Sequence, residues 1–438
     1  MKKTVIYLIT LILIIGVQTV KADDSKILTL DDCIKLTLQS NPQLKSSEMN
    51  IMSSEGNYGI ARSNMLPQVN AVADWQRATA NLAATSKSPY ISNFIVPPGN
   101  TNYPYYSASI GLNQQIFTFG KNYFGMRSAS ELVKSSEYNF INTRNTLIYD
   151  VKQNFFNLLQ YNMIIDTDEY LIKQVETQLK QAEVYYKAGI DSKIDVLSAK
   201  ASLGNIRLNL ITAENARQIY ILNLLSLMNM PLTDDVEFKG ALAAAPFSSD
   251  INAATEQALN IRPDYLALKK QLDAATYSYK QSYSAFFPSL TGNASYNWAG
   301  QAFPIVWNWQ VGLELTFNIF SGLQNSSALE VARAGMLQLK YNLDQEKLSV
   351  GLQVASAIDT IQQAEKSISV AGDTVKQSEA NLALVSKGYK AGVNNYLDYL
   401  TAVSTYQNAK SSYASALANY NIAIANLDYV IGKGLPNE

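Results

Sequence analysis

One stretch of sequence decides the fold: Tyr186-Lys187-Ala188-Gly189-Ile190, followed by Asp195-Val196-Leu197. It returns as Tyr389-Lys390-Ala391-Gly392-Val393, followed by Asp398-Tyr399-Leu400, at a constant offset of 203 residues. The prolines repeat as well, since Pro42 and Pro67 lie 25 residues apart and so do Pro263 and Pro288. Self-similarity at a period of roughly 200 residues indicates two copies of one structural unit rather than a short-period solenoid. We therefore predict two tandem repeats, residues 23–240 and 241–438.

The first 22 residues are typical of an export signal. Lys2 and Lys3 precede an apolar run, and Val20 and Ala22 occupy the two positions that a signal peptidase reads. Removing this segment lowers the 35 basic residues by three, to 32, against 36 acidic residues, so the mature chain has a net charge of −4. That balance argues against a nucleic-acid partner.

The composition also argues against an enzyme. The chain has no histidine, so the commonest general base and the commonest metal ligand are missing. No nucleophile with a base, metal cluster or phosphate-binding loop is evident, and neither a cofactor nor a metal is expected. Cys33 is the single cysteine, which excludes an intrachain disulfide, and we interpret it as a small buried residue.

Four segments alternate between apolar and polar residues, two in each repeat. We predict strands at about residues 68–79, 105–118, 289–299 and 306–320, with a long loop at 80–104 between the first two. Past residue 22 no run of 18 or more apolar residues occurs, which excludes a membrane-spanning helix. Any membrane-spanning part must therefore be made of strands.

Tryptophans strengthen the membrane interpretation of these strands. All four lie in them: Trp75, Trp298, Trp307 and Trp309. Alternation over about ten residues, with aromatic side chains on one face, is typical of outer-membrane barrel strands whose tryptophans form a girdle at the interface with lipid. Asp74 and Glu314 then belong to the polar face that lines the lumen. A half-buried antiparallel sheet in a soluble protein would alternate as well.

The remaining chain is predicted to be helical. No proline occurs from 105 to 230 or from 305 to 435, and the long helices are expected to reach about residues 230 and 433. A helix over residues 121–187 would be about 100 Å long. Helices of this length are stable in water only when they pack side by side, as in coiled coils. Gly189 and Gly392 end these helices, and Asp191, Ser192, Asn394 or Asn395 can cap the next ones.

The predicted strands require an oligomer. Four strands cannot close a barrel, and an open edge in lipid leaves backbone groups unsatisfied at several kcal/mol each. Two chains would give eight strands and a filled interior, whereas three would give twelve strands and room for a conduit. Three copies are expected if anything passes through.

Nearly the whole mature chain resembles the TolC-like outer-membrane efflux proteins. The residues that carry the resemblance are Leu28-Thr29-Leu30 with Asn41-Pro42, the strand ends Ile116-Phe117-Thr118-Phe119-Gly120 and Asn318-Ile319-Phe320-Ser321-Gly322, and the two Tyr-Lys-Ala-Gly turns. The resemblance implies an α+β membrane protein of two tandem repeats. It implies a homotrimer in the outer-membrane lipid with a twelve-stranded β-barrel, continued by a twelve-helix periplasmic coiled-coil tunnel. It also implies docking with a periplasmic adaptor protein and an inner-membrane pump, whose type is left open.

The resemblance implies roles for residues near the two turns. Asp398 matches a position whose carboxylates ring the pore constriction, with Asp195 as its counterpart, while Thr401 stands where the family often has a second acid. Tyr389 and Asn394 match a tyrosine and an arginine that hold the tip shut, with Asp195 as the acceptor. We hypothesise that Tyr389 donates to Asp195 in the closed state and that the missing arginine makes the gate easier to open.

Plainer structural roles are compatible with the same residues. An acid in the first turn of a helix, as at Asp195 and Asp398, is stabilised by the helix dipole. Tyr186 and Tyr389 can be packing residues between helices. Gly189 and Gly392 form turns in either case, and together with Tyr186 they are candidates for adaptor docking.

The favoured function is a passive exit duct for small molecules or drugs in a tripartite efflux system. The same duct in type I protein secretion is the nearest alternative, and a non-conducting periplasmic coiled-coil scaffold is an alternative of a different class.

Overall fold

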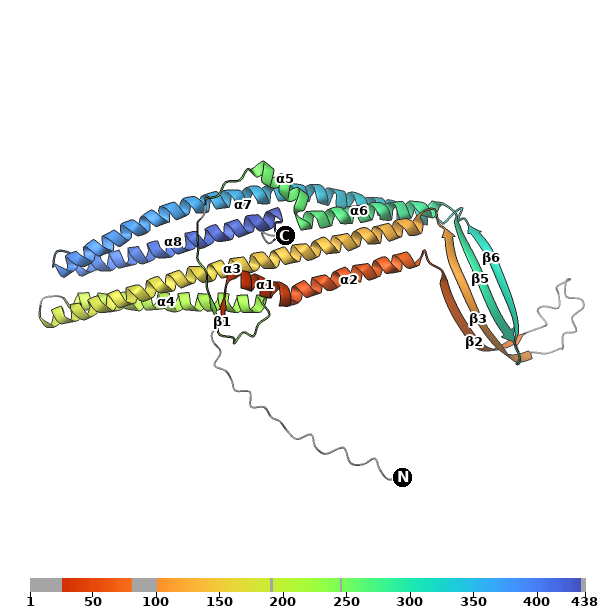
Figure 1. Cartoon of the computed structure of the whole chain (residues 1–438), viewed down its shortest axis with the longest axis horizontal. Coiled ribbons are helices and arrows are strands. Elements are labelled where there is room, and N and C mark those ends of the chain that lie inside the picture. The colour runs from red at the N-terminus through yellow and green to blue at the C-terminus, as the bar shows by residue number, and fades with distance from the viewer. Residues whose placement is uncertain (1–25, 81–100, 190–191, 245, 435–438) are drawn as a thin grey trace, which may run out of the picture.

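The computed structural model describes residues 26–80, 101–189, 192–244 and 246–434. The predicted signal peptide and most of the predicted loop at 80–104 lie outside these residues. The described chain is elongated and mostly helical, with a sheet at one end and the ends of two helical hairpins at the other (Figure 1). Among the described residues, no helix has both the length and the apolar character needed to cross a membrane.

The two halves of the chain share a series of two shorter helices, two long strands and two long helices, to which the first half adds two short strands and the second a 3₁₀ helix. The first half comprises β1 (Lys26–Leu28), α1 (Leu30–Ser40), α2 (Pro42–Ser63), β2 (Gln68–Ala80), β3 (Thr101–Phe117), α3 (Lys121–Lys187), α4 (Lys193–Leu227) and β4 (Val236–Phe238). The second comprises α5 (Ile251–Ile261), α6 (Pro263–Tyr283), the 3₁₀ helix η2 (Ser284–Phe286), β5 (Ser289–Gly300), β6 (Val306–Thr316), α7 (Gln324–Lys390) and α8 (Tyr396–Ile431).

The long helices have matching lengths in the two halves. Helices α3 and α7 contain 67 residues each, and the returning helices α4 and α8 contain 35 and 36. At 1.5 Å per residue, 67 residues span about 100 Å. Helix α3 covers the residues over which the sequence predicted a helix, 121–187.

The four long strands form one antiparallel sheet in the order β2-β3-β5-β6. Strands β3 and β5 come from different repeats and pair in its centre, with Ile110 opposite Tyr296. The outer edges of β2 and β6 therefore have no neighbouring strand among the described residues.

Two predicted strand bounds need correction. Strand β3 begins at Thr101 rather than 105, so residues 101–104 belong to a strand and not to the loop. Pro104 is tolerated because it pairs only with Arg77 of β2, whereas the ladder with β5 starts later, at Tyr106. Strand β6 ends at Thr316 rather than 320, because its partner β5 begins at Ser289, directly opposite.

The helices form a layer in which each half of the long helices has different neighbours. Near the tips, α3 packs against α4 on one side and α8 on the other, and α8 packs against α7. Nearer the sheet, α3 packs against α2 and α6, and α6 packs against α7. The layer therefore has free edges at α4 and α7 near the tips, and at α2 and α7 near the sheet.

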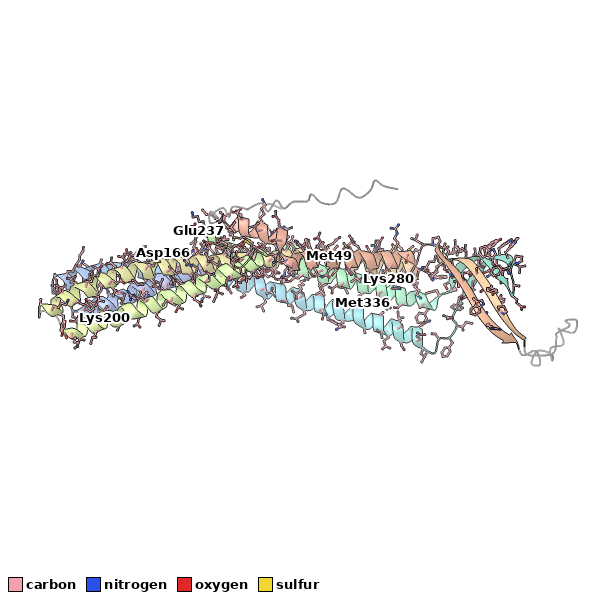
Figure 2. All side chains as sticks on the ribbon, turned by 90° about the horizontal axis from the view of Figure 1, so that it is seen from below. Met49, Asp166, Lys200, Glu237, Lys280 and Met336 are labelled. Carbon is pink, nitrogen blue, oxygen red and sulfur yellow. The ribbon has the colours of Figure 1, made fainter. Side chains whose placement is uncertain are left out.

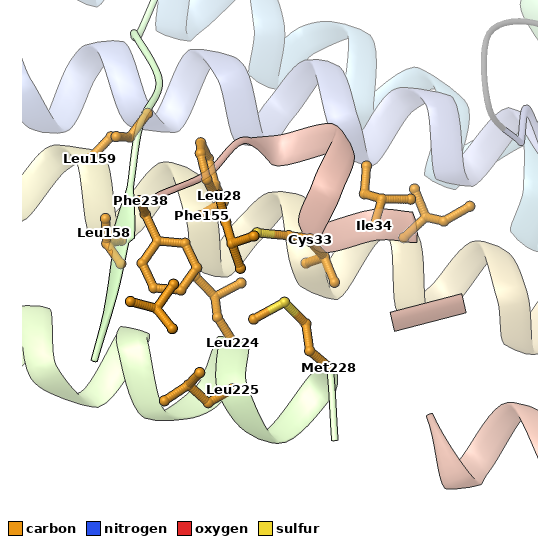
Figure 3. Packing of buried hydrophobic residues seen from close by; sticks show 13 residues of the cluster. Leu28, Cys33, Ile34, Phe155, Leu158, Leu159, Leu224, Leu225, Met228 and Phe238 are labelled. Carbon is orange, nitrogen blue, oxygen red and sulfur yellow. The ribbon is translucent and has the colours of Figure 1, made fainter. Parts of the chain in front are cut away.

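Midway along the helices, each repeat has its own apolar core. In the first, Cys33, Phe155, Leu224 and Phe238 are buried where α1, α3, α4 and the parallel pair β1–β4 meet (Figure 3). Residues at the 203-residue offset take the same places in the second core: Val151 and Val354, Phe155 and Ile358, Leu158 and Ile361, Leu224 and Leu427. The repeat seen in the sequence is thus a repeat of packing.

Cys33 is fully buried, as predicted. Burial, and then the neighbouring Asp32 carboxylate, raises the pKa of its thiol to about 12. A thiol with so high a pKa stays protonated near neutral pH and is a poor nucleophile, so Cys33 acts as a core residue.

Candidate functional site at the helical tip

The two glycine turns end α3 and α7 at the same end of the molecule (Figure 1). Gly189 and Gly392 have φ values of +71° and +72°, in the left-handed region that favours glycine. After α7, the Val393 amide donates to the Gly388 carbonyl at 2.9 Å, and the Gly392 amide donates to the Tyr389 carbonyl at 3.0 Å. This is a complete Schellman motif, which satisfies carbonyls that the helix end would leave free. Both glycines therefore lie in the turns that end the long helices.

The returning helices begin at side-chain caps, with one acid in the first turn of each. Ser192 accepts from the Ile194 amide at 3.1 Å. Asn395 accepts from the Asp398 amide at 2.8 Å, while the Asp398 carboxylate accepts from the Asn395 amide at 3.3 Å. Asp398 is therefore one half of a reciprocal capping box and remains exposed. Asp195 takes the equivalent position in α4 and is half-buried.

A cluster of tyrosines lies between the repeats at the tip. The ring of Tyr389 meets that of Tyr396 edge-on at 5.1 Å and stacks over Tyr399 at 6.3 Å. These rings belong to an apolar cluster that includes Val175 of α3 and Leu203 of α4. Tyr389 thus packs between helices of both repeats, one of the two roles that the sequence allowed for it.

Tyr396 is a tip residue that the sequence reasoning missed. It is 2% exposed, and its hydroxyl is buried without a hydrogen-bond partner. Burial first, and then Tyr399, Tyr389 and Asp195, raise the pKa of this hydroxyl well above its ordinary value. The Asp195 contribution means that this carboxylate of the first repeat lies near the second repeat's cluster. The signal was present in the sequence, because tyrosines at 396, 399 and 406 share one face of α8.

The two repeats differ in detail around their turns. Tyr186 is 45% exposed, whereas its counterpart Tyr389 is 7% exposed. The Asn394 side chain lies directly over Gly388, where any larger residue would collide with it, and the backbone N–H of Asn394 donates to the Gly388 carbonyl at 3.3 Å. Among the described tip residues, Tyr389 is thus buried beside its turn, whereas Tyr186 is exposed beside the other.

The opposite end of the molecule has two acids on the polar face of the sheet. Asp74 pairs in register with Ser107, at the middle of β2, and Glu314 pairs with Thr291, near the helices. Glu314 accepts from the Thr316 hydroxyl at 3.4 Å. The two acids therefore lie at different heights of one polar face.

The tryptophans gather near the end of the sheet that is farther from the helices. Trp75 pairs with Tyr106, Trp298 pairs with Trp307, and Trp309 pairs with Tyr296. The end of the sheet next to the helices has phenylalanines instead: Phe117, Phe119, Phe286, Phe287, Phe317 and Phe320, all exposed. Aromatic residues therefore border the sheet at both ends.

Comparisons with known proteins agree on one family. The sequence profile of the outer membrane efflux protein family matches residues 33–230 and 254–433. The toluene efflux pump outer membrane protein TtgC of Pseudomonas putida is 24% identical over 397 residues, covering 85% of this chain and 76% of that protein. Outer membrane protein TolC of Escherichia coli is 23% identical over 388 residues, covering 84% and 75%.

Solved structures have the same fold. The CmeC outer membrane channel of Campylobacter jejuni superposes with a TM-score of 0.83 at 18% identity, over 92% of this chain and 86% of that one. The open state of the MtrE outer membrane channel of Neisseria gonorrhoeae gives 0.77 at 21% identity, over 93% and 89%.

The chain belongs to the outer membrane efflux protein family. Its place is the outer membrane, from which it extends into the periplasm, and its function is that of an outer-membrane efflux channel. Members of this family are transport ducts rather than enzymes. The family resemblance predicted from the two turns and the strand ends is confirmed.

Proposed function

We propose that three copies of this chain form one continuous exit duct for small molecules, made of a twelve-stranded barrel and a twelve-helix tunnel. The observation that carries the proposal is that sheet and helical layer are open at corresponding edges. Among the described residues, β2 and β6 each have one unpaired side, and closing the sheet onto further copies would satisfy those backbone groups. Twelve strands leave a lumen wide enough for a conduit, whereas eight would be filled by side chains.

Apolar side chains at the helical edges support the same closure. On α4, Leu208 and Ile211 are about 60% exposed and lie on the side away from α3. On α7, Val370 and Leu384 are about 70% exposed, on the side away from the buried residues that face α5 and α8. Packing α4 of one chain against α7 of the next would bury both rows, as in a coiled coil.

The tip is the proposed constriction and gate. Three copies of Asp398, with Asp195 close by, would make an acidic ring that favours cations. We propose that Tyr389 donates to Asp195 in the closed state and that Asn394, which stands where the family's archetype has an arginine, leaves the gate with one link fewer. The buried position of Tyr389 in the inter-repeat cluster and the position of Asp195 near that cluster support this arrangement.

Partners are proposed from the family and from the exposed tip. Channels of this family work with a periplasmic adaptor and an inner-membrane pump in tripartite efflux. Gly189, Gly392 and the exposed Tyr186 are the residues we assign to adaptor docking. In the barrel, Asp74 and Glu314 would line the lumen, and Trp75, Trp298, Trp307 and Trp309 would form the girdle near the outer surface.

Single-channel recording tests the proposal. The purified mature protein in planar bilayers should give small, cation-selective conductance steps, and detergent extracts should contain heat-modifiable trimers. A protein that gives neither steps nor a stable trimer would not be a duct, and a periplasmic coiled-coil scaffold would then be the better description.

A further inference from the structure

An aromatic pocket lies where the helices meet the sheet. It has a volume of about 480 Å³, within the range of pockets that bind small ligands. Its walls contain five aromatic rings, those of Phe119, Phe124, Tyr279, Tyr283 and Phe287. Among the described residues that line the pocket, Lys280 alone is charged. Lys280 lies near the sheet end of α6 (Figure 2).

The pocket is continuous with the apolar face of the sheet. Phe117 pairs with Leu290 on that face, after an irregularity in the ladder between Gln115 and Phe117. From Phe117 a series of ring contacts runs into the pocket: the Phe117 ring meets Phe119 edge-on at 4.7 Å, and Phe119 stacks on Phe287 at 5.1 Å. Tyr283 follows, edge-on to Phe287 at 5.5 Å. In the proposed barrel the apolar face meets lipid, so the pocket opens at the lipid boundary.

Assembly of the proposed ring leaves the pocket uncovered. Its walls come from the start of α3 and the end of α6, which pack against each other. These are the two inner helices of the layer, whereas α2 and α7 provide its edges. A neighbouring chain that joins at the edges would therefore not cover the α3–α6 groove.

Lys280 is available for an anion from outside the chain. Its ammonium lies 5.4 Å from the centre of the Tyr277 ring, and among the described residues no carboxylate pairs with it. Lys270, lower on the same helix, is by contrast held by Glu131 at 3.1 Å and Asp273 at 3.2 Å. The Arg127 guanidinium also lies over the Tyr277 ring, 5.4 Å from its centre, and adds positive charge on this side of the junction.

We propose that this pocket binds a glycerophospholipid from the periplasmic leaflet of the outer membrane, with an acyl chain against the five rings and the phosphate on Lys280. A lysine ammonium is a suitable point charge for a phosphate, and aromatic rings are favoured at the level of the headgroups. The periplasmic leaflet follows from the position of the pocket at the helical end of the sheet. The assignment rests on the proposed barrel.

Photo-crosslinking in bilayers tests the site. The full mature protein is reconstituted with phosphatidylethanolamine that has a diazirine in one acyl chain, and the adducts are mapped on peptides. We expect adducts concentrated on residues 279–287, and a decrease of about fivefold in Lys280→Gln. Lys121→Gln is the matched control, because Lys121 is exposed at the start of α3 but does not line the pocket. It should label as the wild type does.

Three results would overturn the site: adducts spread evenly around the junction, equal labelling of the two lysine variants, or equal labelling by a diazirine diacylglycerol that lacks the phosphate. The same samples are examined for heat-modifiable trimers and channel conductance. Intact, conducting trimers with one of these labelling results would overturn the lipid site alone. Loss of trimer and conductance in the wild type would overturn the barrel and the lipid site together.

Discussion

At the scale of single residues, Asp398 has two effects that substitution can separate. Its carboxylate caps α8 through the Asn395 amide, and in the proposed trimer it would also supply negative charge to the constriction. Asp398→Asn keeps an acceptor for the cap and removes the charge, so we expect cation selectivity to fall with little change in stability. Reversal potentials in a salt gradient across a planar bilayer measure the selectivity.

Asn395→Ala is the control for this prediction. It removes the cap, at a cost of about 1 kcal/mol in helix stability, and leaves the Asp398 charge in place. Selectivity should then stay near that of the wild type. If the two variants lost selectivity equally, the effect of Asp398 would be on the local fold and not on the permeating ions.

Tyr389→Phe tests the gate. Removing a hydrogen bond to a charged group costs about 1.5–3 kcal/mol, so the open fraction should rise by roughly tenfold or more if Tyr389 holds Asp195 in the closed state. Asp195→Asn should act in the same direction. Channel conductance and antibiotic uptake by cells measure the opening, and unchanged values in Tyr389→Phe would remove Tyr389 from the gate.

Tyr396 should behave differently from Tyr389 because its hydroxyl is buried without a partner. An unsatisfied buried polar group costs about 1–3 kcal/mol, so Tyr396→Phe should leave the melting temperature unchanged or raise it. Tyr396→Ala removes the ring from the inter-repeat cluster and should destabilise by about 3–5 kcal/mol. Thermal unfolding of the detergent-solubilised protein measures both, and a clear loss in Tyr396→Phe would mean that the hydroxyl has a partner in the assembled protein.

At the scale of elements, the contact between α3 and α8 contains a buried carboxyl group. Asp168 is 1% exposed, and one of its oxygens accepts from Gln407 of α8 at 2.7 Å while the other has no partner. Burial raises the pKa of Asp168 above its ordinary value near 3.8, although the Gln407 hydrogen bond lowers it in part. The folded state therefore binds this proton more tightly than the unfolded state.

The consequence is a pH dependence with a defined sign. Because the pKa of Asp168 is higher in the folded state, stability should increase as the pH falls from neutral through that raised pKa. Asp168→Asn should raise the melting temperature at pH 7. The variant should also lack the gain in stability that the wild type shows as the pH falls. The control is Asp373→Asn on the exposed side of α7, which should keep the wild-type dependence. Parallel pH curves for wild type and Asp168→Asn would contradict the prediction.

The elements themselves were largely predictable from sequence, for physical reasons. Gly189 and Gly392 end helices because their φ values suit glycine, and the spacing of apolar residues gave α3 with its observed bounds. The start of β3 was not predictable, because Pro104 looks like a loop residue until its single strand partner is known.

Side-chain contacts between the two repeats could not be predicted from local sequence patterns either. The sequence pointed to Tyr389, Asp195 and Asp398 by their repetition, but Tyr396 has Lys193 at the corresponding position of the first repeat. Its role comes from packing between α8 and helices of the first repeat, a contact between residues far apart in the chain. Periodicity identifies a face of a helix, and only the fold shows what that face meets.

At the scale of the whole molecule, the open edges predict that assembly can be weakened without harming the fold of one chain. Leu208 and Ile211 are 62% and 60% exposed on α4, on the side away from α3, so acids at these positions should cost a single chain little. In the proposed trimer they would be buried against α7 of the neighbour, where two unpaired charges are strongly unfavourable. We expect the double variant Leu208→Asp, Ile211→Asp to lose heat-modifiable trimers and to appear as monomer by light scattering in detergent, with its helical circular dichroism retained.

Val184→Asp is the matched control for this assembly prediction. Val184 is 61% exposed, as Leu208 is, but it lies on α3, which already has α4 on one side and α8 on the other. A new charge there would face the lumen or the periplasm of the proposed ring rather than a neighbouring chain, so the trimer should persist. If Val184→Asp dissociated the trimer as readily as the α4 variant, exposed apolar residues would matter for assembly wherever they lie. If neither did, the ring would close through contacts other than α4 and α7, and the order of helices around the tunnel would have to be different from the one that the free edges predict.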